Sequence, residues 1–192
     1  MATQRRQHRR TFNSPGHAHE LTFSCFESLP LLASDRTLEW LAESINRAKI
    51  EFGFDVWAYV FMPEHAHLIV RPRLSTYNMS ALRRAIKEPV GRKAIGYLKK
   101  HSPDYLPRLT RQRGAREERL FWQSGGGYDR NIVTTATLLS AIDYIHMNPV
   151  RRNLVARAAE WKWSSAEWFE RQAETPVQMD LIPSEWLNES VS

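Results

Sequence analysis

The chain has a single cysteine, Cys25, among its 192 residues, which excludes an internal disulfide. Cys25 lies in an apolar run, and we interpret it as a small buried thiol in a reducing compartment, because burial raises a thiol's pKa and blocks access. No stretch approaches the roughly 20 consecutive apolar residues that a membrane-spanning helix needs. The arginine-rich residues 1–10 are not followed by the apolar run of a secretory signal. These absences predict a cytoplasmic protein without a membrane segment.

Apolar residues make up 42% of the sequence, so a globular fold is expected rather than disorder. The formal net charge is +6, and it is unevenly distributed. Residues 83–119 contain twelve Lys or Arg and four acidic residues, so the remainder of the chain carries a net charge of −2. A concentrated basic segment suits a polyanionic partner, because each neutralised phosphate releases condensed counterions. A solvated helix face followed by a basic loop explains the same charge, and composition leaves both interpretations open.

The hydrophobic pattern predicts one domain over residues 17–170, preceded by a flexible basic arm at 1–16 and followed by a loosely packed tail at 171–192. The elements follow the order strand, helix, strand, strand, helix, strand, and then one added C-terminal helix. This order is typical of an α+β fold of the ferredoxin-like (split βαβ) kind, an antiparallel sheet with helices on one face. We expect strands at residues 21–26, 56–62, 65–71 and 120–123, a basic loop at 101–118, and helices at 35–52, from 80 onward (kinked or divided at Pro89) and at 134–148.

A His-x-His pair lies on the predicted third strand, in the run MPEHAHLIV at residues 62–70. Side chains alternate along a strand, so His65 and His67 are expected on one face, about 7 Å apart by the ~3.3 Å rise per residue. Two imidazoles at that spacing are able to share one metal ion. A pair of surface or packed histidines produces the same pattern, so the spacing alone leaves the two interpretations open.

The predicted last helix ends in the run DYIHMNPV at residues 143–150 and bears a tyrosine. Tyr144 and Asn148 are four residues apart, which places them together on one helix face. A tyrosine with a polar amide one turn below it suits a nucleophile beside a metal ligand. A boundary tyrosine with its hydroxyl in water is the commoner fate of helix tyrosines.

Taken together, these motifs resemble the REP-associated tyrosine transposases, members of the HUH single-tyrosine transposase superfamily that includes the IS200-like transposases. The resemblance covers most of the chain and rests on separated matches in the family's order. The run at 62–67 matches the histidine–hydrophobe–histidine motif, and the run at 143–152 matches the tyrosine helix and the segment after it. Further landmarks are Phe121-Trp122-Gln123, Tyr128-Asp129-Arg130 and Trp161-Lys162-Trp163-Ser164-Ser165.

The resemblance implies a metal-dependent endonuclease and strand transferase that acts on single-stranded, hairpin or repeat DNA. Tyr144 would be the nucleophile, His65 and His67 the metal ligands, and Asn148 the third ligand, whereas His146 is assigned no metal role. Two neutral imidazoles and an amide oxygen bring no negative charge, so Mg²⁺ or Mn²⁺ would keep its full charge for the phosphate. The product would be a 5′-phosphotyrosine link and a free 3′-hydroxyl. The resemblance is compatible with a monomer or a homodimer, associated with the nucleoid.

The basic residues are expected to contact backbone phosphates rather than to read bases. The candidates lie in the amino-terminal arm, in the basic segment and beside the glycine-rich turn: Arg5, Arg6, Arg83, Arg84, Lys87, Arg92, Lys93, Arg111, Arg113 and Arg130.

Two other functions remain open from the sequence. A nucleic-acid-binding module could keep this scaffold and cut nothing, although the intact trio of His65, His67 and Tyr144 argues against lost chemistry. A metal-dependent phosphodiesterase could use a second His-x-His pair, His17 and His19, with water as the nucleophile, although a polar strand entry is the simpler interpretation of that pair. Only a covalent protein–DNA species distinguishes the transposase-like chemistry from both.

Overall fold

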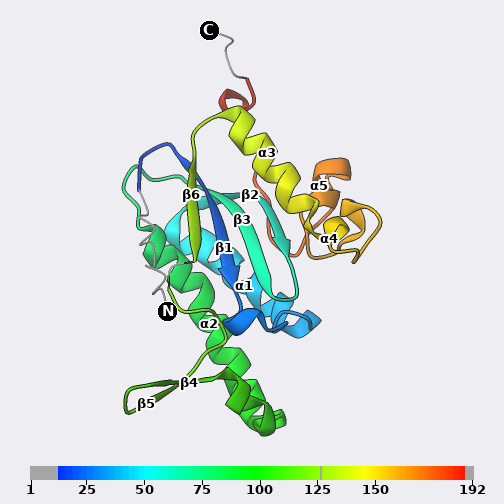
Figure 1. Ribbon diagram of the computed structural model, residues 1–192. Coiled ribbons are helices and arrows are strands. Elements are labelled where there is room, and N and C mark those ends of the chain that lie inside the picture. Colours follow the sequence, from blue (N-terminus) through cyan, green and yellow to red (C-terminus); the bar gives the residue numbers. More distant parts are fainter. Residues whose placement is uncertain (1–12, 126, 189–192) are drawn as a thin grey trace, which may run out of the picture.

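The fold is built on a four-stranded antiparallel sheet in the order β2-β3-β1-β6 (Figure 1). The structure is a computed structural model that describes residues 13–125 and 127–188. The strands are β1 (Ala18–Ser24), β2 (Phe54–Phe61), β3 (His65–Pro72) and β6 (Tyr128–Ile132). Helix α1 (Asp35–Phe52) connects β1 to β2, and β3 lies between them, which is the arrangement that a split βαβ unit requires. The predicted α+β class is therefore confirmed, with a strand order compatible with the ferredoxin-like arrangement.

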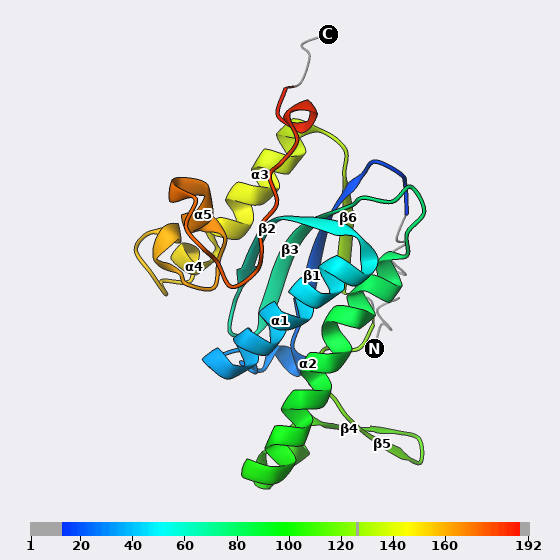
Figure 2. The same cartoon turned by 180° about the vertical axis from the view of Figure 1, so that it is seen from behind.

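Helices cover both faces of the sheet. Helices α1 and α2 (Met79–His101) lie side by side on one face, which Figure 2 shows from behind. Helix α3 (Thr135–His146) packs on the opposite face, where Leu138, Ala141, Ile142 and Ile145 meet Trp57, Val60 and Ile69 of the sheet. Helix α3 therefore packs on the sheet through a second hydrophobic core, separate from the one under α1 and α2.

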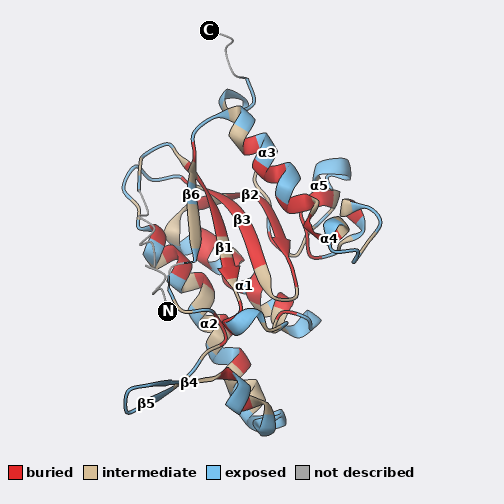
Figure 3. Ribbon diagram, in the orientation of Figure 1, coloured by how far each residue is buried: buried red, intermediate tan, exposed pale blue. Residues whose placement is uncertain are grey.

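Alternation along β3 separates the larger core from the candidate site. Ala66, Leu68 and Val70 are buried with α1 and α2 in the larger core. His67 and Ile69 point the other way, toward α3. Figure 3 shows that the middle of the sheet is buried, whereas the exposed residues gather on the outer helix faces and the loops. Cys25 is fully buried in the larger core, and burial raises its pKa to about 12, in agreement with a packed thiol.

The fourth strand is not where the sequence predicted it. Residues 120–123 cross the end of β1 with only an isolated bridge between Trp122 and Cys25, and the edge strand is β6. The apolar pair Phe121 and Trp122 is buried in the core, which gave these residues the appearance of a strand. β6 reads Tyr-Asp-Arg-Asn-Ile, so its polar side chains on both faces hid its strand character.

The predicted basic loop also has regular structure. It contains the 3-10 helix η2 (Pro103–Leu109) and a hairpin of β4 (Thr110–Arg113) and β5 (Arg116–Arg119). The two strands form a separate two-stranded sheet, which projects beside the C-terminal half of α2 (Figure 1). The prolines at 103 and 107 and the run of charges concealed this local pairing.

Pro89 does not divide α2, which continues from Met79 to His101. Proline lacks the N–H that would donate to the carbonyl four residues earlier, here that of Ala85. The Ser44 hydroxyl of α1 lies 3.3 Å from that carbonyl and donates to the neighbouring carbonyl of Ile86 at 2.8 Å. A hydroxyl from the neighbouring helix therefore lies next to the carbonyl that lacks a helical donor, which sequence periodicity could not show.

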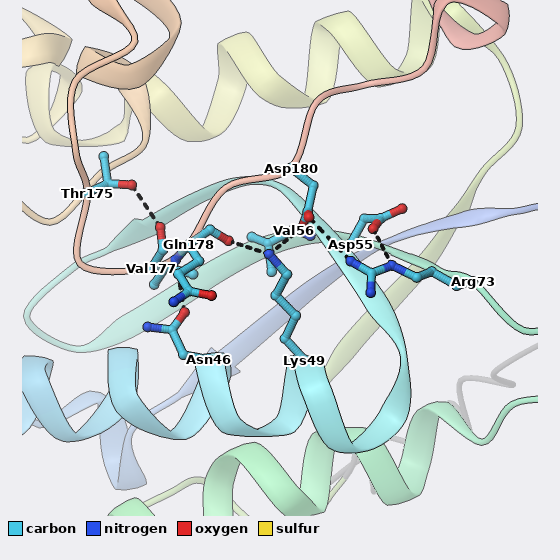
Figure 4. A network of polar contacts seen from close by, with 9 residues as sticks. All are labelled: Asn46, Lys49, Asp55, Val56, Arg73, Thr175, Val177, Gln178 and Asp180. Carbon is cyan, nitrogen blue, oxygen red and sulfur yellow. Dashed lines mark hydrogen bonds and ion pairs between the residues drawn. The ribbon is translucent and has the colours of Figure 1, made fainter.

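The C-terminal segment is fixed on the sheet, and the expectation of loose packing is wrong for the described residues up to 188. Residues 163–165 pair with the free edge of β2, where Phe61 N donates to Trp163 O at 2.8 Å. Further on, Asp180 accepts from Val56 N and forms an ion pair with Lys49 at 2.6 Å (Figure 4). The remaining chain comprises α4 (Asn148–Arg151), α5 (Ala166–Arg171) and the 3-10 helices η1 (Phe26–Ser28), η3 (Ala158–Glu160) and η4 (Ser184–Trp186). Within the described ranges, no helix has the length and apolar character to span a membrane.

Candidate active site

The two histidines of β3 lie together at the start of that strand, facing α3. Their ring centroids are 4.8 Å apart and the rings are nearly perpendicular. Each ring is held by a neighbour through Nδ1: Glu64 Oε1 lies 3.1 Å from His65 Nδ1, and Thr22 Oγ1 of β1 lies 3.0 Å from His67 Nδ1. The Glu64 carboxylate accepts from His65 Nδ1, which leaves the lone pair of His65 on Nε2, the state in which an imidazole binds a metal. The Thr22 hydroxyl is able to accept from His67 Nδ1 in the same way.

Both rings are held in the neutral form. Burial lowers the pKa of His67 to about 3, and the adjacent His65 lowers it further in the same direction. Burial also lowers the pKa of His65, although the Glu64 carboxylate partly opposes this shift. Protonation and metal binding compete for the same nitrogen, so a low pKa keeps the pair available to a metal near neutral pH.

Tyr144 lies beside this pair, on the last turn of α3. Its ring centroid is 6.1 Å from that of His67, with the rings edge to face, and the side chain is 49% exposed. The Arg151 guanidinium lies 4.9 Å from the centre of the Tyr144 ring and donates to the Tyr144 carbonyl at 3.0 Å. The Tyr144 side chain is therefore accessible, and both a histidine and a cation lie beside its ring.

Asn148 is the first residue of α4, and Met147 separates it from the end of α3 at His146. Its Nδ2 donates to the carbonyls of Tyr144 and Ile145 at 2.9 and 3.3 Å, so the side chain caps the end of α3. The contacts of the described residues join Asn148 to the backbone of Tyr144 and not to either histidine. Nowhere in residues 13–125 and 127–188 do three His, Cys, Asp or Glu side chains form a metal-binding group. The role of Asn148 as a third ligand stays a prediction.

Tyr144 and His67 open onto a cleft of about 420 Å³. Two of its lining residues, Glu20 of β1 and Arg130 of β6, form an ion pair at 2.7 Å. The sequence gave no sign of Thr22 or Glu20, because their place in the site depends on the pairing of β1 with β3 and β6. The cleft is lined by Glu20, Thr22, His67, Tyr128, Arg130, Ser140, Ala141 and Tyr144.

The predicted phosphate-contacting residues fall into different environments. Arg83 is buried and its Nη1 lies 3.3 Å from the buried carboxylate of Asp129, and its contact to a phosphate stays a prediction. Burial and the nearby Arg83 lower the pKa of Lys87 to about 8, and its Nζ approaches two backbone carbonyls at 3.5 Å. Ion pairs hold Lys93, Arg111 and Arg113, whereas Arg84 and Arg92 are exposed on α2. Arg5 and Arg6 lie outside the described residues.

The second histidine pair is not part of this site. His19 is fully buried, and its ring contacts Asp129 through Nδ1 and Tyr77 through Nε2, each at 2.8 Å. It alternates with Glu20 along β1 and therefore faces α2. His17 contacts the Asn131 side chain at 2.9 Å. This geometry removes the basis for a phosphodiesterase that uses both pairs around one metal.

Three other motif residues have structural contacts. His146 is buried and its Nε2 lies 2.8 Å from Ser165 Oγ, so it points away from the cleft. Trp122 Nε1 donates to the carbonyl of Lys87, and Trp161 Nε1 donates to that of Phe61. These landmarks hold α2 and the C-terminal segment against the sheet.

The chain was compared with known proteins. No protein-family model matches it. It is 26% identical over 167 residues to a Haemophilus influenzae protein named "Putative REP-associated tyrosine transposase", covering 81% of this chain and 84% of that protein. A solved structure of a REP-associated tyrosine transposase bound to a REP hairpin matches the whole length of both chains, with a TM-score of 0.64 and 20% identity. The chain is thus similar in sequence to a protein named as a REP-associated tyrosine transposase and has the fold of another, which agrees with the resemblance of its motifs.

Proposed function

We propose that this protein is a metal-dependent single-stranded DNA endonuclease and strand transferase that acts on hairpin DNA through a 5′-phosphotyrosine intermediate. The observation that carries the proposal is the placement of Tyr144 beside His67 in one open cleft, with the ring centroids 6.1 Å apart. A nucleophile and a metal-binding pair at this distance are able to meet the same phosphate.

The residues present fit a divalent metal. His65 and His67 are neutral, and their Nδ1 atoms are engaged by Glu64 and Thr22, which leaves both Nε2 atoms for coordination. Asn148 is the candidate for an amide oxygen ligand, since its Nδ2 is already committed to the end of α3. Mg²⁺ or Mn²⁺ bound there would supply positive charge that polarises the scissile phosphate.

The protein's own residues prepare the nucleophile. An unperturbed tyrosine has a pKa near 10 and is a weak nucleophile at neutral pH. Arg151 lies over the Tyr144 ring and is tied to the Tyr144 carbonyl, so it packs against the nucleophile and helps to hold it in place. The ring is mounted at the end of a helix that is packed on the sheet, which restricts its orientation more than a loop would.

Hairpin DNA is the proposed substrate because the structural relative is bound to a REP hairpin. The cleft is open, and Arg130 on its rim is 44% exposed in its side chain and held in place by Glu20. Arginine donates to phosphate oxygens through several N–H groups, so Arg130 suits a backbone contact next to the site of cutting.

The test is denaturing electrophoresis of labelled hairpin DNA incubated with the protein and Mn²⁺. Tyr144→Phe removes one exposed oxygen, so the protein should still fold and bind DNA, but cleavage and the protein–DNA adduct should both disappear. Tyr128→Phe is the matched control in the same cleft and should keep both. An adduct that persists in Tyr144→Phe and disappears in Tyr128→Phe would move the nucleophile to β6. Cleavage without any adduct in the unmodified protein would favour a hydrolase, and binding without cleavage would favour a DNA-binding module.

A further inference from the structure

The separate sheet of β4 and β5, called here the β4–β5 ribbon, has one strongly basic face. Residues directly opposite one another in an antiparallel pair have their side chains on the same face. The register pairs Arg111 with Glu118 and Arg113 with Arg116, so these four side chains share one face and give it a net charge of +2. The opposite face has no net charge and is formed by Thr110, Gln112, Glu117 and Arg119.

The end of the basic face has two arginines directly opposite each other. Like charges in this position destabilise an antiparallel pair, so the ribbon gains nothing from having Arg113 beside Arg116. Glu118 lies 2.7 Å from Arg111 and 3.7 Å from Arg113, so one carboxylate serves two guanidinium groups. The Arg113 side chain is 76% exposed, and Arg116 is exposed as well. This arrangement favours a polyanionic partner that contacts the end of the ribbon.

The ribbon has the dimensions of an element that enters a DNA groove. Its strands have four residues each, about 13 Å at ~3.4 Å per residue, and paired strands lie ~4.8 Å apart. The turn consists of Gly114 and Ala115, and Gly114 has a φ of 60°, so the tip is tight and its side chains are small. The major groove of B-form DNA is ~12 Å wide and admits a two-stranded ribbon, whereas the minor groove, at ~6 Å, is too narrow.

The ribbon is anchored at the end of the sheet where the histidine pair begins. Leu120 N donates to Leu109 O at 2.8 Å and extends the pairing of the ribbon toward the sheet. Two residues further on, Trp122 bridges to Cys25, and Gln123 N donates to Ser24 O at 2.8 Å. Figure 1 shows the ribbon projecting beyond the end of β1, and Figure 2 shows the same arrangement from behind. The basic face is therefore fixed relative to the candidate active site.

We propose that the basic face of the β4–β5 ribbon enters the major groove of the duplex stem of a DNA hairpin, where Arg113 and Arg116 donate to guanine bases. The proposal rests on the proposed function, which makes hairpin DNA the substrate. Arginine is able to donate two hydrogen bonds to O6 and N7 of guanine, an acceptor pair that the major groove presents at no other base. Such contacts select a sequence, which phosphate contacts do not. The ribbon thus chooses the stem, whereas Tyr144 acts on the strand that is cut.

The experiment measures which stems the full chain binds, without divalent metal so that no strand is cut. The probe is a pool of DNA hairpins with a randomised stem, a constant thymidine loop and a constant single-stranded tail. Sequencing of the bound fraction should show a preference for guanine at particular stem positions. Arg113→Gln or Arg116→Gln should lower that preference by about fivefold or more. Arg119→Gln is the matched control and should keep it, because Arg119 lies on the opposite face of the same ribbon, paired with Glu117 at 3.4 Å.

A second measurement separates base contacts from phosphate contacts. In the preferred hairpin, 7-deazaguanine at the selected positions removes the N7 acceptor and leaves the backbone intact. It should weaken binding to the unmodified protein and have a smaller effect on binding to Arg113→Gln. A loss of affinity in Arg113→Gln that is equal for all stems, with no effect of 7-deazaguanine, would show phosphate contacts only and would overturn the inference.

The inference also fails if the unmodified protein has no guanine preference in the stem, or if Arg113→Gln and Arg119→Gln change that preference equally. The proposed function is read separately, from the Tyr144 adduct that forms on the same hairpins with Mn²⁺. An adduct without a guanine preference would refute only the role of the ribbon. A guanine preference that depends on Arg113, without any adduct, would support the ribbon and refute the proposed chemistry.

Discussion

At the residue scale, the site depends on how each histidine is held. Thr22 lies 3.0 Å from His67 Nδ1, and Glu64 fixes His65 while it also pairs with Arg152. Such partners set which ring nitrogen has the proton and how the ring is oriented. The histidine motif could be identified from the sequence. Its partner Thr22 could not, because that contact depends on how β1 pairs with β3.

Thr22→Val should weaken Mn²⁺ binding without unfolding the protein. The change keeps the shape of the side chain but removes the oxygen that holds His67 Nδ1, and loss of such a partner typically costs 10–100-fold in metal affinity. Titration calorimetry of Mn²⁺ binding measures this directly, independently of cleavage. Ser140→Ala, in the same cleft, is the control and should bind Mn²⁺ as the unmodified protein does. Equal affinities for all three proteins would show that the Thr22 hydroxyl does not contribute to metal binding by His67.

At the element scale, Ser44 and Pro89 form a pair whose energetic coupling is measurable. Ser44→Ala removes the hydroxyl that faces the carbonyls of Ala85 and Ile86, and should lower the free energy of unfolding by about 1–2 kcal/mol. In a Pro89→Ala background, residue 89 has an N–H that is able to donate to the Ala85 carbonyl. Ser44→Ala should then lower the free energy of unfolding by less. Urea denaturation of the four proteins gives the coupling by a double-mutant cycle. Additive effects would mean that Ser44 does not compensate for the proline.

The elements that the sequence predicted best are those with an unmixed hydrophobic pattern. The helix from Asp35 was expected from its serine cap and its spacing of Leu38, Leu41 and Ile45, and the structure has it over the same residues. Strands β2 and β3 were equally evident. β6 was missed because it has polar side chains on both faces. Asp129 contacts the buried His19 on one face, and Tyr128 and Arg130 line the open cleft on the other. Periodicity detects one buried face, and β6 has none of sufficient length.

At the scale of the whole molecule, the C-terminal segment acts as a clamp on the sheet. Lys49 is 7% exposed, and its Nζ pairs with Asp180 at 2.6 Å and donates to the carbonyl of Gln178 at 3.0 Å (Figure 4). Trp186 packs on Trp57 beneath α3, with the ring centroids 5.1 Å apart. The tail therefore contacts α1, β2 and α3. Breaking these contacts should lower the free energy of unfolding of the whole domain.

Asp180→Ala should destabilise the protein by about 2–3 kcal/mol. It leaves Lys49 buried without its charge partner, and breaking a fully buried pair costs 3–5 kcal/mol, which is reduced here because Asp180 is partly exposed. Glu170→Ala, which breaks only the exposed pair with Arg157, should cost about 0–1 kcal/mol. Chemical denaturation followed by tryptophan fluorescence compares the two. Similar losses in both variants would mean that the tail contributes little beyond its surface contacts.

The charge of the whole molecule leads to the last prediction, the salt dependence of DNA binding. The predicted phosphate contacts have different environments, since Arg83 is committed to Asp129 in the interior whereas Arg84 is exposed with only a weak 3.8 Å pair to Glu88. Affinity for hairpin DNA should fall linearly on a logarithmic salt scale, with a slope near −0.9 per neutralised phosphate on a duplex stem. If Arg84 contacts a phosphate, Arg84→Gln should reduce that slope by about 1 and weaken the binding of all DNA sequences alike, without loss of stability.

Arg83→Gln should instead lower the free energy of unfolding, because the carboxylate of Asp129 is left buried without this cation. Fluorescence anisotropy from low to physiological salt, together with denaturation of both variants, separates the two roles. A slope that Arg84→Gln leaves unchanged would remove Arg84 from the DNA-binding surface.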